Sequence, residues 1–354
     1  MAALFPAGAQ PSPPSADPSG QPEPLYDVEM SLFAAYVAAP SRPDWGPLEI
    51  LWGQREWREP LLERLRAEDP TERARAALAL GLIGATRARD PLASALRDRE
   101  ATVRRYAALA LCYLGDKRGQ AEAERALHGG QVWERYLAFI GLWRLDAPDT
   151  RAMLEAARYE QGPLLRSLIP RALAAPPWRP KPPYPSRSGD LPEAAPAGEL
   201  WEQVADGLAW GSDYWWHQGD YDQVCVLLEQ SLFFSPHRVE VYDDVAWLQW
   251  SLGRGERAVQ VLERGIALNP ESWLAHFNLG FHYFNTKRYA PALPCLKYAA
   301  EHTETWWVPI HTYAHDLEAL DRREEAVQVW KDTVQRFPQD VTAQRNLARL
   351  VGTE

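Results

Sequence analysis

Apolar residues recur along the chain at helical spacing, in blocks that repeat every 31 residues at first and every 34 residues later. The block ARAALALGLIG at 74–84 returns as RYAALALCYLG at 105–115 and, more loosely, as RYLAFIGLWRL at 135–145. Repeats at a fixed period are typical of solenoids, in which each helical unit packs on its neighbours. Alternating strand patterns are nearly absent. The pattern therefore predicts an all-α protein.

Each N-terminal repeat predicts an Ala/Leu-rich helix, a glycine turn and a shorter second helix. The second helix keeps the 31-residue step at Leu65, Leu96 and Leu127. Glycines at 84 and 115 are suited to end the first helix in the left-handed conformation. Alanine pairs at 76–77 and 107–108 let neighbouring helices approach closely.

The stretch DREATVRRYAALALCYLGD at 98–116 resembles the short HEAT-type repeat, including the variety first noted in phycobilin lyases. The resemblance covers roughly residues 45–170 and implies a HEAT-like solenoid over residues 25–174. It leaves a distant bilin-lyase-like activity open. That activity is supported only by the repeat type, which many non-catalytic proteins share.

The C-terminal half follows a 34-residue grid, with prolines at 236, 270 and 338 and Glu304 in the place of the missing one. The stretch NLGFHYFNTKRYAPALPCLKYA at 278–299 resembles a tetratricopeptide repeat. The positions that match the signature of that family are Leu279, Gly280, Tyr283, Ala292 and Ala299. The resemblance implies a tetratricopeptide domain over 200–354, with about four repeats and a capping helix at its end.

Proline-rich segments separate and precede these arrays. Residues 175–199 hold six prolines in their first twelve positions, which predicts a semi-rigid linker and a domain boundary. Residues 1–24 predict a disordered Pro-rich tail. The apolar stretch at 28–40 is interpreted as a helix that caps the first repeat, because a membrane-surface helix would need a basic face. The prediction is two tandem solenoids joined by a Pro-rich linker.

The tetratricopeptide register divides the aromatic stretch HFNLGFHYF at 276–284 into two faces. Phe277, Phe281 and Phe284 stand at i, i+4 and i+7, which places them on one stripe facing the groove. Equivalent positions in the other repeats complete a predicted partner-binding groove made of Asp213, Trp216, Asp243, Trp247, Trp250, Phe277, Phe281, Phe284, His311, His315 and Arg345. Two alternatives remain for these rings, namely extra core or interdomain packing and occlusion by the linker or the tail.

Charge and cysteine content narrow the partners and the compartment. Residues 199–354 carry 23 acidic and 13 basic side chains, which argues against nucleic-acid binding. No run of 18 apolar residues predicts a membrane span. Three widely separated cysteines form no disulfide framework and no CxxC pattern, which favours the cytoplasm. A periplasmic or exported location stays open if a leader has been removed.

Catalytic and cofactor motifs are missing from the sequence. It contains no GxxxxGK[ST] loop, no GxGxxG after a strand and no GxSxG elbow. In HTYAHDLE at 311–318, His311 and His315 have metal-ligand spacing but lack the glutamate of an HExxH site. We expect ordinary histidines there, and no catalytic residue, metal or cofactor.

Arginines recur beside acids in the N-terminal half, for example Arg73 and Arg75 beside Glu72 and Asp98. We interpret them as a ladder of charges between repeats on a solvated face. The functional alternative is docking of an acidic partner, including the C-terminal half of this chain.

The sequence as a whole predicts a non-catalytic scaffold that binds a peptide or helix of a partner protein. The alternatives are a metal-binding or enzymatic protein that uses His311 and His315, and a structural subunit of a larger assembly.

Overall fold

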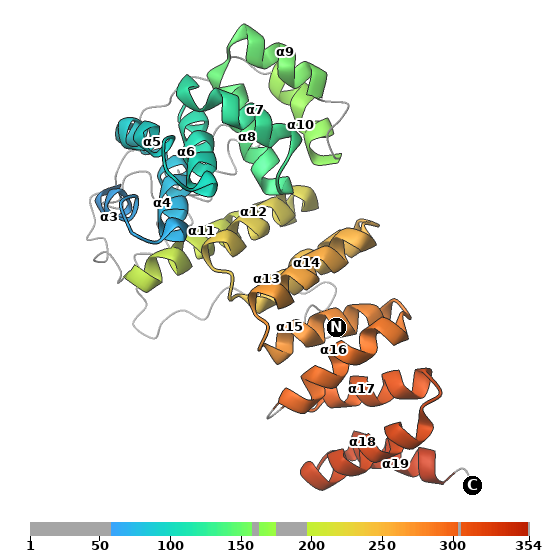
Figure 1. Cartoon of the computed structure of the whole chain (residues 1–354). Coiled ribbons are helices and arrows are strands. Elements are labelled where there is room, and N and C mark those ends of the chain that lie inside the picture. The colour runs from blue at the N-terminus through green and yellow to red at the C-terminus, as the bar shows by residue number, and fades with distance from the viewer. Residues whose placement is uncertain (1–57, 158–162, 175–196, 304–305, 353–354) are drawn as a thin grey trace, which may run out of the picture.

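The computed structural model describes residues 58–157, 163–174, 197–303 and 306–352, and every regular element in those ranges is a helix (Figure 1). This confirms the all-α solenoid. The predicted tail at 1–24, the predicted capping helix at 28–40 and most of the predicted linker lie outside the described residues. Helix α11 begins at Ala197, three residues before the start of the predicted tetratricopeptide domain at residue 200.

The N-terminal array consists of short helices that pack side by side. They are α3 (Arg58–Arg64), α4 (Pro70–Leu82), α5 (Arg89–Ala95), α6 (Ala101–Tyr113), α7 (Gln120–His128), α8 (Val132–Leu145), α9 (Pro148–Ala157) and α10 (Pro163–Ala174), with 3-10 turns at Thr86–Ala88 and Lys117–Gly119. Helix α6 lies between α4 and α8. A Cβ atom at Gly81 would lie 2.7 Å from Ala110 Cβ, and one at Gly141 would lie 2.7 Å from Cys112 Cβ. Small residues thus set the close spacing of these three helices.

The C-terminal array consists of four helical pairs and a final helix. They are α11 (Ala197–His217) with α12 (Tyr221–Phe234), α13 (Val239–Ser251) with α14 (Gly255–Leu268), α15 (Trp273–Asn285) with α16 (Tyr289–His302), α17 (Val308–Ala319) with α18 (Arg323–Arg336), and α19 (Val341–Val351). The first helices of the pairs form a layer, in which α15 packs against both α13 and α17. In Figure 1 the pairs descend in order from α11 to α19.

Left-handed residues mark the turn inside each repeat. Gly84 and Gly115 have φ of 70° and 72°, which confirms the predicted helix ends. In the C-terminal array, φ is positive at four positions 34 residues apart: Gly219 (71°), Gly253 (76°), Lys287 (59°) and Asp321 (60°). The turn geometry is therefore conserved along the array even where glycine is replaced by a residue with a side chain.

The two arrays share one hydrophobic core, which the sequence did not predict. Helix α12 packs against α8, and Phe233 of α12 lies 4.6 Å from Tyr106 and 5.6 Å from Trp133, measured between ring centroids. Trp201 of α11 donates a 2.8 Å hydrogen bond to Glu72 Oε1 of α4. The first tetratricopeptide-like pair thus packs directly on the N-terminal array.

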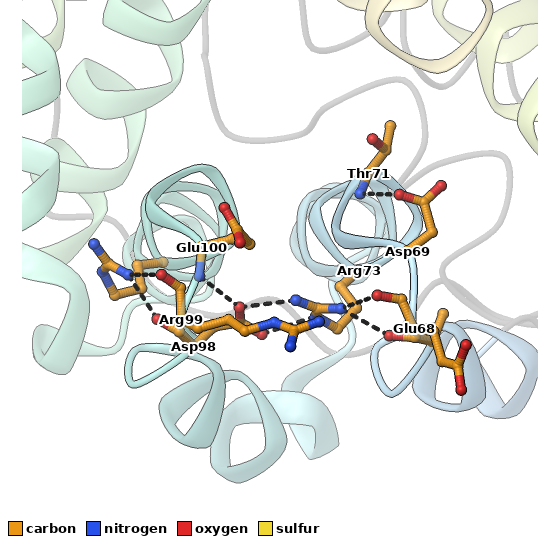
Figure 2. Close-up of polar contacts among 9 residues, drawn as sticks. Glu68, Asp69, Thr71, Arg73, Asp98, Arg99 and Glu100 are labelled. Carbon is orange, nitrogen blue, oxygen red and sulfur yellow. Dashed lines mark hydrogen bonds and ion pairs between the residues drawn. The ribbon is translucent and has the colours of Figure 1, made fainter.

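The predicted ladder of solvated charges is wrong for Arg73 and Arg75. Figure 2 shows Arg73 in a fork on Asp98, with Nε at 2.8 Å from Oδ2 and Nη2 at 3.0 Å from Oδ1. Only 7% of Arg73 is exposed, and its Nη1 also donates to the carbonyl oxygens of Ala67 and Glu68. Arg75 Nε donates to the Phe233 carbonyl oxygen at 3.1 Å. Arg73 therefore joins neighbouring repeats, and Arg75 joins the two arrays. Carbonyl groups at helix ends lack partners within their own helix, so a planar guanidinium group can donate hydrogen bonds to them.

Gly253 and Gly255 provide a matched test of the repeat turn. No heavy atom lies within 4 Å of a Cβ atom added at either glycine, but only Gly253 is left-handed. We expect Gly253→Ala to lower the free energy of unfolding by about 1 kcal/mol, because a left-handed conformation costs a residue with a Cβ atom roughly that much. Gly255→Ala should leave it unchanged or slightly raised, since alanine is favoured in a helix. Urea titrations of both variants test this, and equal losses would contradict it.

Candidate functional site

The candidate site is the stripe of equivalent positions on the first helices of the C-terminal array, here called the first-helix stripe. Its members are Asp213 and Trp216 on α11, Asp243, Trp247 and Trp250 on α13, Phe277, Phe281 and Phe284 on α15, and His311 and His315 on α17. The opposite face packs as the register predicts, since Leu279 and Tyr283 are 5% and 8% exposed. A Cβ atom at Gly280 would lie 2.8 Å from the Leu296 side chain of α16, so this face is in close contact.

Three tryptophans of the stripe are open to solvent. Trp216 of α11 is 39% exposed, Trp247 is 45% exposed and Trp250 is 47% exposed. Trp216 and Trp247 stack across the two repeats, with ring centroids 6.2 Å apart and an interplanar angle of 26°. Trp216 also meets Tyr221 of α12 edge-on at 5.3 Å. Neighbouring repeats thus present one joined aromatic surface.

Two carboxylates accompany these rings. Asp213 stands three residues before Trp216 on α11, is exposed, and lies 3.6 Å from His217 Nε2. Asp243 stands four residues before Trp247 on α13 and is half-buried. Burial disfavours its charged form, and the neighbouring Asp244 repels it, so the pKa of Asp243 is raised to about 6.

The phenylalanines differ from one another in their access to solvent. Phe281 and Phe284 are half-buried at the surface of α15. Phe277 is only 5% exposed, so it packs in the core and does not line an open surface as predicted. The reason is Trp306, whose ring meets Phe277 edge-on at 5.4 Å, while Phe281 stacks against Phe277 at 5.3 Å.

His311 is part of the packing between helices, which the sequence did not predict. Its Nε2 lies 2.5 Å from Oδ2 of Asp340, the residue that caps the N-terminus of α19. Its ring also contacts Trp330 of α18, with centroids 5.1 Å apart. His311 therefore ties α17 to α18 and α19.

His315 is engaged in a similar way one turn further along. It lies 5.1 Å from the Trp330 ring, and its Nδ1 is 3.3 Å from Glu318 Oε1. Glu318 in turn accepts hydrogen bonds from Trp330 Nε1 and Arg349 Nη2. Burial lowers the pKa of His315. Arg345, the last predicted groove residue, is exposed on α19.

No group of three or more His, Cys, Asp or Glu side chains in the described ranges is placed to hold a metal ion. The candidate pair for metal chemistry, His311 and His315, makes the contacts just given. Within the same ranges, no helix combines the length and apolar content needed to cross a bilayer.

A second group of rings was missed by the sequence analysis. Trp306 and Trp307 precede α17 and are 41% and 40% exposed. Trp306 lies 5.8 Å from Trp273, and Trp307 lies 6.2 Å from Phe337. The signal was present, because Trp273 and Trp307 occupy equivalent places on the 34-residue grid. These positions stand at the start of the first helices, outside the stripe that the register predicts.

Asp316 of α17 is a buried acid. It is 0% exposed, and neither of its carboxylate oxygens has a hydrogen-bond partner among the described residues. Burial raises its pKa to about 6. A neutral carboxyl is therefore favoured in the folded protein until the pH exceeds that value.

The HEAT-repeat family matches residues 58–143. Among solved structures, a crystal structure of MamA is 17% identical, covers 40% of this chain and 82% of its own, and has a TM-score of 0.34. A structure of MamA MSR-1 C2 is 23% identical, with 44% and 86% covered and a TM-score of 0.33. MamA 41-end from Desulfovibrio magneticus RS-1 is 16% identical, with 43% and 82% covered and a TM-score of 0.34. No curated protein matches the chain.

The match over residues 58–143 lies inside the segment whose repeats resemble the HEAT type. The C-terminal array consists of helical pairs at the 34-residue step that the tetratricopeptide resemblance implied.

We expect Asp316→Asn to change how stability depends on pH. The folded-state pKa of Asp316 lies above the ordinary value, so its contribution to stability is full below pH 4 and is lost as pH rises through 6. The variant lacks this loss. Its free energy of unfolding, relative to that of the natural protein, should therefore rise between pH 4 and pH 7 by on the order of 2–3 kcal/mol.

Denaturant titrations at several pH values measure this difference. Asp332→Asn, at an exposed position of α18, is the matched control and should show no such trend. The same trend in both variants would contradict the account.

Proposed function

We propose that the protein is a non-catalytic interaction scaffold whose first-helix stripe binds a helical or extended segment of a partner protein. The observation that carries the proposal is the exposure of Trp216, Trp247 and Trp250 at neighbouring stripe positions on two repeats. Tryptophan is the residue most often found as an anchor in protein interfaces. A contiguous patch of exposed rings is also a common mark of a binding surface.

The magnitude of ring burial supports a partner of peptide size or larger. Each indole leaves about 100 Å² open at its observed exposure, which is worth roughly 2–3 kcal/mol when it is removed from water. Three rings together provide about 7 kcal/mol, whereas association costs about 4–15 kcal/mol. The half-buried Phe281 and Phe284 and the flanking acids must therefore contribute as well.

Three features favour a scaffold over an enzyme. The sequence carries no catalytic motif, His311 and His315 are engaged in packing contacts, and both arrays are of repeat types that present surfaces for binding. The free thiols of Cys112, Cys225 and Cys295 suit a reducing compartment such as the cytoplasm.

The double variant Trp247→Ala/Trp250→Ala tests the proposal in affinity capture with the full chain. Both side chains are exposed, so the melting temperature should change little. We expect the partners that the natural protein captures to be depleted at least fivefold with this variant. Trp307→Ala, which removes a ring of similar exposure outside the stripe, should retain them. Identical captures from the natural protein and the stripe variant would refute the proposal.

A further inference from the structure

The first helices of the C-terminal array share an unusual distribution of charge. The sequences of α11, α13, α15 and α17 contain nine aspartates and glutamates and no lysine or arginine. All 13 basic residues of 199–354 lie on the second helices, in the turns or on α19. In the layer that carries the exposed rings, α11, α13 and α17 therefore carry acidic residues without basic ones, and α15 carries neither.

The carboxylates beside the tryptophans are not neutralised by the protein. Asp243 takes part in no hydrogen bond or ion pair with the described residues, and its pKa is raised by burial and by repulsion from Asp244 beside it. The side chain of Asp213 is 60% exposed, and among the described residues it pairs only with His217, which is charged only when protonated. A cationic ligand would relieve the repulsion at Asp243 and pair with Asp213.

Each of these acids lies one turn before an exposed indole on the same face of its helix. Asp213 precedes Trp216 by three residues and Asp243 precedes Trp247 by four, and both spacings bring side chains together on a helix. A cation above an indole face is attracted by the ring quadrupole. One ligand group can therefore contact a ring and a carboxylate at once.

Resting on the proposed function, we propose that the segment bound by the first-helix stripe is arginine-bearing, with guanidinium groups on the open faces of Trp247 and Trp216 and paired to Asp243 and Asp213. Arginine suits both contacts, because its planar group stacks on aromatic rings and pairs with a carboxylate through two hydrogen bonds. Lysine offers only a point charge and would bind more weakly.

The spacing of the rings excludes a cage around a single cation. Trp216 and Trp247 are stacked with centroids 6.2 Å apart. A planar cation needs about 3.5 Å to each ring, or roughly 7 Å between the rings. The guanidinium groups therefore lie on the outer ring faces, beside the carboxylates.

Isothermal titration calorimetry with the full chain and three synthetic decapeptides tests the proposal. The first peptide carries three arginines spaced by alanine and leucine, and the other two carry glutamine or glutamate in place of the arginines. We expect the arginine peptide to bind at least tenfold more tightly than the glutamine peptide and the glutamate peptide not to bind. Equal affinity for all three, or binding of none, would overturn the inference, while the capture experiment still decides the proposed function on its own.

Two variants with the same change in net charge locate the binding. Asp213→Asn/Asp243→Asn should weaken the binding of the arginine peptide at least tenfold. Glu256→Gln/Glu324→Gln, at exposed positions of α14 and α18 with no described partner, should weaken it less than twofold. Equal losses would mean that the peptide responds only to the overall charge of the protein, which would overturn the inference.

A third variant tests whether the chain occupies the stripe itself. Residues 175–196 include Arg179, Lys181 and Arg187. If Arg179→Gln/Lys181→Gln/Arg187→Gln binds the arginine peptide with the affinity of the natural protein, this segment does not occupy the site, as proposed. Tenfold tighter binding would assign the stripe to the chain's own residues and would overturn the inference.

Discussion

The packing of each helix on small residues is the constraint on which the rest of the C-terminal array depends. A helix in a solenoid buries one face against its neighbours. The buried face is the one on which small residues let a neighbouring helix approach closely. On α15 it is set by Gly280, where a Cβ atom would meet the Leu296 side chain at 2.8 Å. Once this face is buried, the opposite face of the helix, which carries the stripe, is left for solvent or for a partner. The position of the candidate site therefore follows from the packing of the helices.

The periodic part of the fold could be predicted from the sequence, because each repeat makes the same contacts as the next. The helical pairs and the left-handed turns at Gly84 and Gly115 follow from this rule. The joint between the arrays could not be predicted, since it pairs a residue of one array with a residue of the other and no repeat period relates the two. Phe233 against Tyr106 and Trp201 against Glu72 are examples. Similarly, the repeat period did not predict that the Arg73 side chain would be buried against Asp98.

In the candidate site too, the exposure of a side chain could be predicted only where the repeat pattern alone determines it. The register points Trp247 and Trp250 toward solvent, and both are exposed. It also points Phe277 and His311 that way, but a register does not say what a non-periodic neighbour covers. Trp306 covers Phe277, and Asp340 holds His311 at the cap of α19. The exposed aromatic part of the stripe is consequently shorter than predicted and lies on α11, α13 and α15.

The central claim is that the exposed indoles of α11 and α13 are where a ligand touches the protein. Two-dimensional NMR of the indole N–H groups, assigned by Trp→Phe substitutions, tests it most directly during titration with the arginine peptide. The account predicts that the signals of Trp216, Trp247 and Trp250 shift together and saturate. The signals of the fully buried Trp133 and Trp330 should stay in place. Saturable shifts confined to Trp306 and Trp307, with the stripe signals unchanged, would contradict it.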